Sequence, residues 1–167
     1  MNSPRDDASD VDRHGRRKRH PRSTAEAWRT MNQHDEAHRA NNQADMGPRE
    51  RLRAELLVSG LYDYVPLVQI ASTIAREDMA ETLPAQQELA LQTIRSLVED
   101  GLVLIGDLPF PGETFAGWDL SIDAAMDRVC DLFVGHYEER QLWDLTIWLA
   151  LTPAGERLAR ELRNQRR

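Results

Sequence analysis

The feature that most constrains the fold lies near the C-terminus, in the stretch LTIWLALTPAGERLARELR at residues 145–163. Its first part is a run of leucine, β-branched and aromatic side chains, which is typical of a strand. The run stops at Thr152–Pro153, and Leu158 and Leu162 then recur at the spacing of one helix face. We therefore expect a strand over 145–151 that leads directly into a closing helix, because proline is favoured in the first turn of a helix.

Two helices are predicted at the start of the region that can fold. The first covers about residues 48–61, where Pro48 suits the first turn and leucines recur at helical spacing. In the second, Asp63 is a candidate cap and Pro66 lies in the first turn, before an apolar stripe that reaches Ile74. The second helix is short, and its single stripe indicates that it is partly buried.

A longer third helix precedes the first predicted strand. Thr82 is its candidate N-terminal cap, its apolar face runs to Val98, and Gly101 supplies the left-handed residue that commonly ends a helix. Residues 102–108 (LVLIGDL) follow at once. They are too short and too rich in β-branched side chains for another helix, so they are predicted to form a strand.

Residues 109–144 form an insertion between the two predicted strands. They begin as a loop rich in proline and glycine. A helix then follows Ser121 as its cap and ends near Gly135, with an apolar face of Ile122, Met126, Val129 and Phe133. Trp118, Trp143 and Trp148 cluster around this insertion, and we expect them mainly to seal it onto the core, with Trp148 as a core residue. The alternative is that some remain exposed as anchors of a protein interface.

A helix-turn-helix followed by two strands joined by a loop is the arrangement of a winged helix. We therefore expect a mostly helical α+β fold, with a winged-helix domain over residues 47–167. The insertion, about 109–144, would lie between the two wing strands. The strand over 145–151 would be the return strand of the wing, and Thr152–Pro153 would begin the helix that closes the domain.

Two segments, SLVEDGLV (96–103) and WLALTPAGERLA (148–159), resemble parts of MarR-like and PadR-like winged-helix proteins. They correspond to the end of the third helix and to the corner between the wing and the last helix, where an L-V-x-x-G-L-V run and an L-T-x-x-G corner recur. The matching residues are Leu97, Val98, Gly101, Leu102, Leu151, Thr152 and Gly155. The resemblance covers roughly residues 50–163 and implies the fold, since these residues build the corner and carry no chemistry. The long insertion departs from the family, where this turn is usually short.

Residues 1–46 are predicted to be a disordered polar tail. Apart from Val11 and Trp28, their apolar residues are nearly all alanine and methionine, so they bury too little surface to offset the entropy of ordering. Met31 and Met46 both precede the first residue of an apolar stripe, so either is an alternative start of the native chain.

Charge is distributed unevenly along the chain. Residues 1–50 contain ten Lys/Arg and nine Asp/Glu, whereas residues 51–167 contain eleven and nineteen. The region expected to fold therefore carries a formal charge of 11 − 19 = −8. Such an acidic body repels phosphate and suits a basic partner.

The outward face of the third helix decides between two hypotheses, because winged helices most often bind DNA through this helix. Its predicted outward residues are Gln87, Glu88, Gln92, Arg95, Ser96 and Glu99. Glutamine can pair with adenine and arginine with guanine, but this helix carries a single cation. The insertion adds more carboxylates, among them Asp119, Asp123, Asp127 and Asp131, and Arg128 is the one cation up to the end of its helix near Gly135. The positive potential expected of a DNA-binding surface is therefore missing.

The leading hypothesis is a non-enzymatic binding protein, of an immunity-type or regulatory adaptor kind. It would recognise a protein partner, with a basic one the best match, through the third helix and the acidic insertion. The alternative is a DNA-binding transcriptional regulator that places Gln87, Gln92 and Arg95 in the major groove, aided by a basic arm of Arg16, Arg17, Lys18 and Arg19. A third hypothesis is a dimer that gathers two acidic domains. The sequence names no partner, operator or small-molecule ligand.

Sequence motifs of catalysis are missing from the chain. It contains no Gly-rich phosphate loop, no nucleophile signature and no set of metal-binding cysteines, so no enzyme, cofactor or metal site is predicted. The single cysteine, Cys130, lies in an apolar helical pattern and allows no internal disulfide, which favours the bacterial cytoplasm. A bacterial source fits the twenty arginines against one lysine, a bias typical of GC-rich genomes. No stretch approaches the roughly 20 apolar residues of a membrane span, and the N-terminus lacks the apolar core of a secretory signal.

Overall fold

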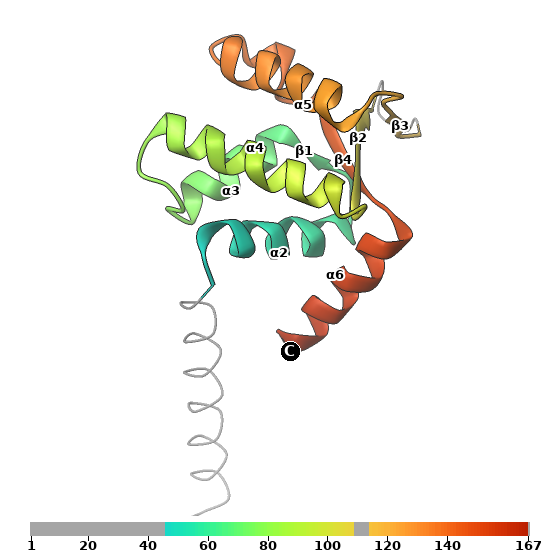
Figure 1. Cartoon of the computed structure of the whole chain (residues 1–167). Coiled ribbons are helices and arrows are strands. Elements are labelled where there is room, and N and C mark those ends of the chain that lie inside the picture. Colours follow the sequence, from blue (N-terminus) through green and yellow to red (C-terminus); the bar gives the residue numbers. More distant parts are fainter. Residues whose placement is uncertain (1–45, 109–113, 167) are drawn as a thin grey trace, which may run out of the picture. The chain divides into compact units, whose positions relative to one another are not determined.

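A computed structural model of the protein describes residues 46–108 and 114–166, and they form a mostly helical α+β structure (Figure 1). The elements are α2 (Pro48–Gly60), β1 (Val65–Pro66), α3 (Leu67–Arg76), α4 (Leu83–Glu99), β2 (Val103–Asp107), β3 (Ala116–Gly117), α5 (Ile122–Cys130), a π-helical turn η1 (Asp131–Gly135), a short 3-10 helix η2 (Arg140–Leu142), β4 (Trp148–Leu151) and α6 (Pro153–Gln165). The predicted tail, apart from Met46, lies outside the described residues, as does the basic arm at 16–19.

Local sequence signals place the starts of three helices as predicted. The side chains of Thr82, Ser121 and Thr152 each accept a hydrogen bond from the backbone N–H three residues later, at 3.3, 3.2 and 3.1 Å. The predicted cap Asp63 is wrong, because α3 begins at Leu67 and Pro66 is its N-cap residue. The residue before a proline favours extended backbone, so Val65 belongs to the short strand β1 and not to the helix.

The sheet has four antiparallel strands in the order β1-β4-β2-β3. The two predicted strands pair with each other, with Val103 opposite Leu151 and Gly106 opposite Trp148. The outer strands β1 and β3 have two residues each, and they were not predicted because two residues show no periodicity.

The hydrophobic core lies where the helices meet the sheet. Helix α2 packs against α4 and α6, while α3 and α5 both pack against α4. The insertion takes part in this core, since Met126, Val129 and Phe133 are buried in the same cluster as Ile94 and Leu97. The insertion is therefore an integral layer of the described unit.

Of the three tryptophans expected to seal the insertion onto the core, Trp143 is buried in it as predicted, whereas Trp148 is not. Trp143 is 2% exposed, and it stacks on Tyr137 at 5.3 Å between ring centroids and meets the ring of Phe133 edge-on at 4.9 Å. Trp148 is only half-buried, so its assignment to the core was wrong. The segment before β4 folds back through η2, and this turn carries Trp143 inward and leaves Trp148 at the edge of the sheet.

Candidate functional site

Helix α5 lies alongside α4 and covers part of the face of α4 that was predicted to point outward (Figure 1). Gln87 shows the effect most clearly. Its side chain was expected at the surface, but Gln87 is 7% exposed and its Nε2 donates a hydrogen bond to the backbone oxygen of Phe133 at 3.1 Å. The outward placement of Gln87 is therefore wrong, because η1 packs over it and provides the acceptor that a buried amide requires.

Arg95 is the single cation of α4, and two carboxylates engage it. Its Nη1 donates to Asp123 Oδ1 at 2.8 Å and to Glu99 Oε1 at 3.3 Å. The hydrogen bond to Asp123, followed by the one to Glu99, raises the pKa of Arg95 above its ordinary value. The insertion thus supplies a counter-charge to the one arginine that could read a base.

Of the other residues singled out on α4, Ser96 is half-buried and accepts a hydrogen bond from Arg53 Nη1, whereas the rest lie at the surface. Glu88, Gln92 and Glu99 are exposed, and Gln92 Nε2 donates to Glu88 Oε1 at 2.6 Å. Together with α5 and its flanks, α4 carries six carboxylates, which we call the acidic surface: Glu88, Glu99, Asp119, Asp123, Asp127 and Asp131. All six are exposed; Asp123, Asp127 and Asp131 follow one another at four-residue spacing along α5 and the start of η1, whereas Asp119 precedes the helix.

This acidic surface has little positive charge to balance it. Six carboxylates stand against Arg95 and Arg128, so the formal charge of α4 and residues 119–131 is 2 − 6 = −4. The guanidinium of Arg128 lies over the ring of Trp118 at 4.1 Å from its centroid. Among the described residues, the ion pairs leave Glu88, Asp119, Asp127 and Asp131 without a cationic partner.

A groove of about 340 Å³ runs between α4 and α5 within this surface. Its lining comes from one face of α4 and one edge of α5: Glu88, Leu91, Gln92, Arg95, Met126, Asp127 and Cys130. Leu91 and Met126 form its apolar floor, whereas Glu88 and Asp127 are exposed at its rim. Cys130 is also exposed. We call this feature the α4–α5 groove.

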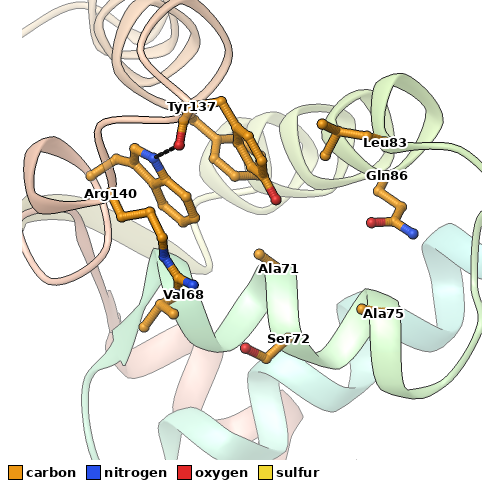
Figure 2. Close-up of a pocket in the computed structure, with 10 residues that line it drawn as sticks. Val68, Ala71, Ser72, Ala75, Leu83, Gln86, Tyr137 and Arg140 are labelled. Atoms are coloured by element: carbon orange, nitrogen blue, oxygen red, sulfur yellow. Dashed lines mark hydrogen bonds between the residues drawn. The ribbon is translucent and has the colours of Figure 1, made fainter.

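A second pocket, of about 160 Å³, lies between α3, the start of α4 and the segment after α5 (Figure 2). Alanine and serine side chains of α3 leave room for it, and Phe133, Tyr137 and Trp143 provide aromatic surface. Trp143 Nε1 donates to the backbone oxygen of Tyr137 at 3.0 Å. At its rim, Arg140 is bonded to Asp144 at 3.0 and 3.3 Å. The sequence gave no signal for this pocket, since its lining comes from three separate segments.

Convergent catalytic groups do not occur in the described part of the chain. His136 Nδ1 lies 2.8 Å from Glu139 Oε1, and this hydrogen bond is the main cause that raises the pKa of His136. Both side chains are exposed, and the only other charge that raises the pKa of His136 is the carboxylate of Asp131. Within residues 46–108 and 114–166, no three His, Cys, Asp or Glu side chains lie close enough together to hold a metal ion.

Comparison of the chain with models of protein families, with characterised proteins and with solved structures gave no match. The resemblance to MarR-like and PadR-like proteins therefore stays a prediction that rests on two short segments. Over the described ranges, no helix combines the length and the apolar character that crossing a membrane requires.

Proposed function

We propose that this chain is a non-enzymatic binding protein whose acidic surface recognises a basic protein partner, as an immunity-type or regulatory adaptor would. The observation that carries the proposal is the pairing of Arg95 with Asp123 and Glu99. It neutralises the one cation of α4 and leaves that surface with a formal charge of −4. Lysine and arginine side chains of a partner would meet exposed carboxylates that have no described cation beside them.

A winged-helix arrangement is part of the same proposal. Its support is the element order, in which α3 and α4 precede the paired strands β2 and β4 and α6 closes the unit. The short strand β1 lies between the first two helices in sequence and pairs with β4. The insertion between β2 and β4 would then be an elaborated wing that carries the acidic residues.

The contacts of Gln87 and Arg95 disfavour the alternative of a DNA-binding regulator. Gln87 is buried, and Arg95 would have to leave two carboxylates before it could reach a base. The carboxylates of α5 would also face the phosphate backbone, which weakens the non-specific affinity that precedes base reading. The third hypothesis, a dimer of two acidic domains, would bring these like charges closer together. A cytoplasmic location is proposed with the protein-binding function, because the single cysteine forms no internal disulfide.

The proposal is tested by affinity capture from cells with two variants of equal charge change. In the first, Asp119, Asp123, Asp127 and Asp131 are all changed to Asn. In the control, four exposed acidic residues outside α4 and α5 are changed to their amides: Asp63→Asn, Asp78→Asn, Glu138→Gln and Glu161→Gln. We expect the native chain and the control to retain one basic protein that the first variant loses.

A gel shift with duplex DNA of mixed sequence separates this proposal from the DNA-binding alternative. The native full-length chain should give no shifted band at moderate salt. A specific band that Arg95→Ala weakens, and that salt reduces steeply, would overturn the protein-binding proposal.

A further inference from the structure

We propose that the α4–α5 groove receives one amphipathic helix of the partner, which inserts an apolar side chain over Leu91 and Met126. Its lysine or arginine side chains would pair with Glu88 on one rim and Asp127 on the other. This inference rests on the proposed function and deepens it, because it names the site and the chemistry of the partner segment.

The groove has the geometry that a third helix requires. Its α4 side consists of positions 88, 91, 92 and 95, which are spaced as one face of a helix. Its α5 side adds Met126, Asp127 and Cys130. Two helices that pack side by side leave a furrow between them, and side chains of another helix fit into such a furrow.

The charges at the rim select a cationic segment. Glu88 and Asp127 lie on opposite helices, and neither has an ion-pair partner among the described residues. At the Arg95 end, Asp123 and Glu99 already neutralise the guanidinium. An acidic helix would be repelled, and a wholly apolar helix would desolvate the two carboxylates without compensation.

The groove also favours a helix over an extended peptide. Helices α4 and α5 satisfy their own backbone hydrogen bonds, so the walls of the groove offer side chains alone. An extended peptide would leave its backbone N–H and C=O groups without partners as it became buried there. A helix arrives with these groups already paired, and it needs to present one apolar residue flanked by cations.

Cys130 provides a reporter for this site, because it lines the groove, is exposed and is the only cysteine of the chain. The probe is a synthetic peptide of about 18 residues, a length at which isolated helices begin to form, with leucines on one face and lysines elsewhere. The full-length chain is treated with iodoacetamide, and mass spectrometry follows the alkylation of Cys130. At a peptide concentration ten times Kd, the fraction of free site falls about elevenfold, so alkylation of Cys130 should slow about elevenfold.

Two control peptides separate an amphipathic helix from simple charge. The first has the same composition in a scrambled order without an apolar face, and the second carries glutamate in place of lysine. We expect neither peptide to protect Cys130. Equal protection by the scrambled peptide would overturn the requirement for an apolar anchor.

Two charge reversals separate the groove from the rest of the acidic surface. Asp127→Lys reverses a rim residue, whereas Asp119→Lys makes the same change outside the groove lining. We expect Asp127→Lys to weaken peptide binding, measured by fluorescence anisotropy, at least tenfold more than Asp119→Lys. Binding that leaves Cys130 reactive, or that both reversals weaken equally, would overturn the groove proposal and leave the proposed function standing. Absence of peptide binding would also overturn it, whereas an Arg95-dependent DNA band would overturn the proposed function itself.

Discussion

At Gly155 the closing helix passes so close to the start of β2 that no side chain fits. An ideal Cβ atom at this position would lie 2.0 Å from the backbone oxygen of Leu102. Thr152 joins the same two segments, since its N–H donates to Leu102 O at 3.0 Å and its hydroxyl donates to Gly101 O at 2.7 Å. Gly101 adopts the left-handed conformation, with φ of +66°. The two motif segments of the sequence therefore meet in space and form one corner.

We predict that Gly155→Ala lowers the free energy of unfolding by about 1–3 kcal/mol, the usual cost of overpacking, because the rigid backbone at Leu102 must shift. Urea denaturation measures the loss. Gly135→Ala is the matched control, since the nearest atom to an added Cβ there is a side-chain oxygen of Asp131 at 3.5 Å. Equal stability of the two variants would contradict the close approach at Gly155.

His136 should titrate above its ordinary pKa of about 6.5, because its hydrogen bond to Glu139 favours the protonated ring. A raised pKa in the folded state means that the stabilising contribution is fully present below the unfolded value. It is lost as the pH rises through the folded value. NMR titration of the imidazole protons gives the midpoint, and Glu139→Gln should lower it. An unchanged midpoint in that variant would show that the Glu139 contact is not formed in solution.

At the scale of elements, the aromatic side chains of Phe133, Tyr137 and Trp143 join the insertion to the rest of the core. Phe133 comes from η1, and Tyr137 and Trp143 come from the segment between η1 and β4, so their rings pack residues from the start and the end of this segment against each other. The guanidinium of Arg140 lies over the ring of Trp143, 5.7 Å from its centroid. Loss of this cluster should loosen α5 from α4.

We predict that Trp143→Ala costs about 3–5 kcal/mol of unfolding free energy, as large core truncations do. Trp148→Ala should cost clearly less, because Trp148 is half-buried and the one hydrogen bond described for its side chain runs from Nε1 to Leu145 O at 2.8 Å. Thermal and urea unfolding of both variants gives the comparison. A larger loss for Trp148→Ala would mean that the core is centred on β4, and it would contradict the packing described above.

The sequence predicted the elements better than it predicted their contacts. Thr82, Ser121 and Thr152 are local signals, since a cap needs only the next turn of its own helix, and all three were confirmed. Hydrophobic periodicity shows which face of a helix is apolar, but it does not show which element covers that face. Gln87 illustrates the limit, because a polar residue on a predicted outward face is buried by η1, a segment 46 residues away.

The candidate site was predictable in its residues and not in its geometry. The six carboxylates and Arg95 were identified from the sequence alone, whereas the pairing of Arg95 with Asp123 depends on the docking of α5 against α4. Asp123 reaches Arg95 across 28 residues of sequence. No periodicity within either helix encodes that distance, and the apolar floor at Leu91 and Met126 becomes a groove only once both helices are in place.

At the scale of the whole described unit, charge separates by element. Helices α2 and α6 contain six arginines and four glutamates, a formal charge of +2, and they pack against each other. Helix α4 and residues 119–131 carry −4. A basic partner would therefore be repelled weakly by the α2–α6 pair and attracted to the acidic surface, so the charge distribution guides its approach as well as its binding.

This separation predicts that association with the lysine-leucine peptide slows as salt is added. Exposed charges interact across about 10 Å at 0.1 M ionic strength and about 3 Å at 1 M, so the association rate should fall across this range. Stopped-flow fluorescence measures it. The variant with Asn at positions 119, 123, 127 and 131 loses four charges and should show a slower rate and a flatter salt dependence. The control with four amides outside α4 and α5 should keep most of the native slope. An association rate that does not change with salt would mean that the apolar floor of the groove acts alone.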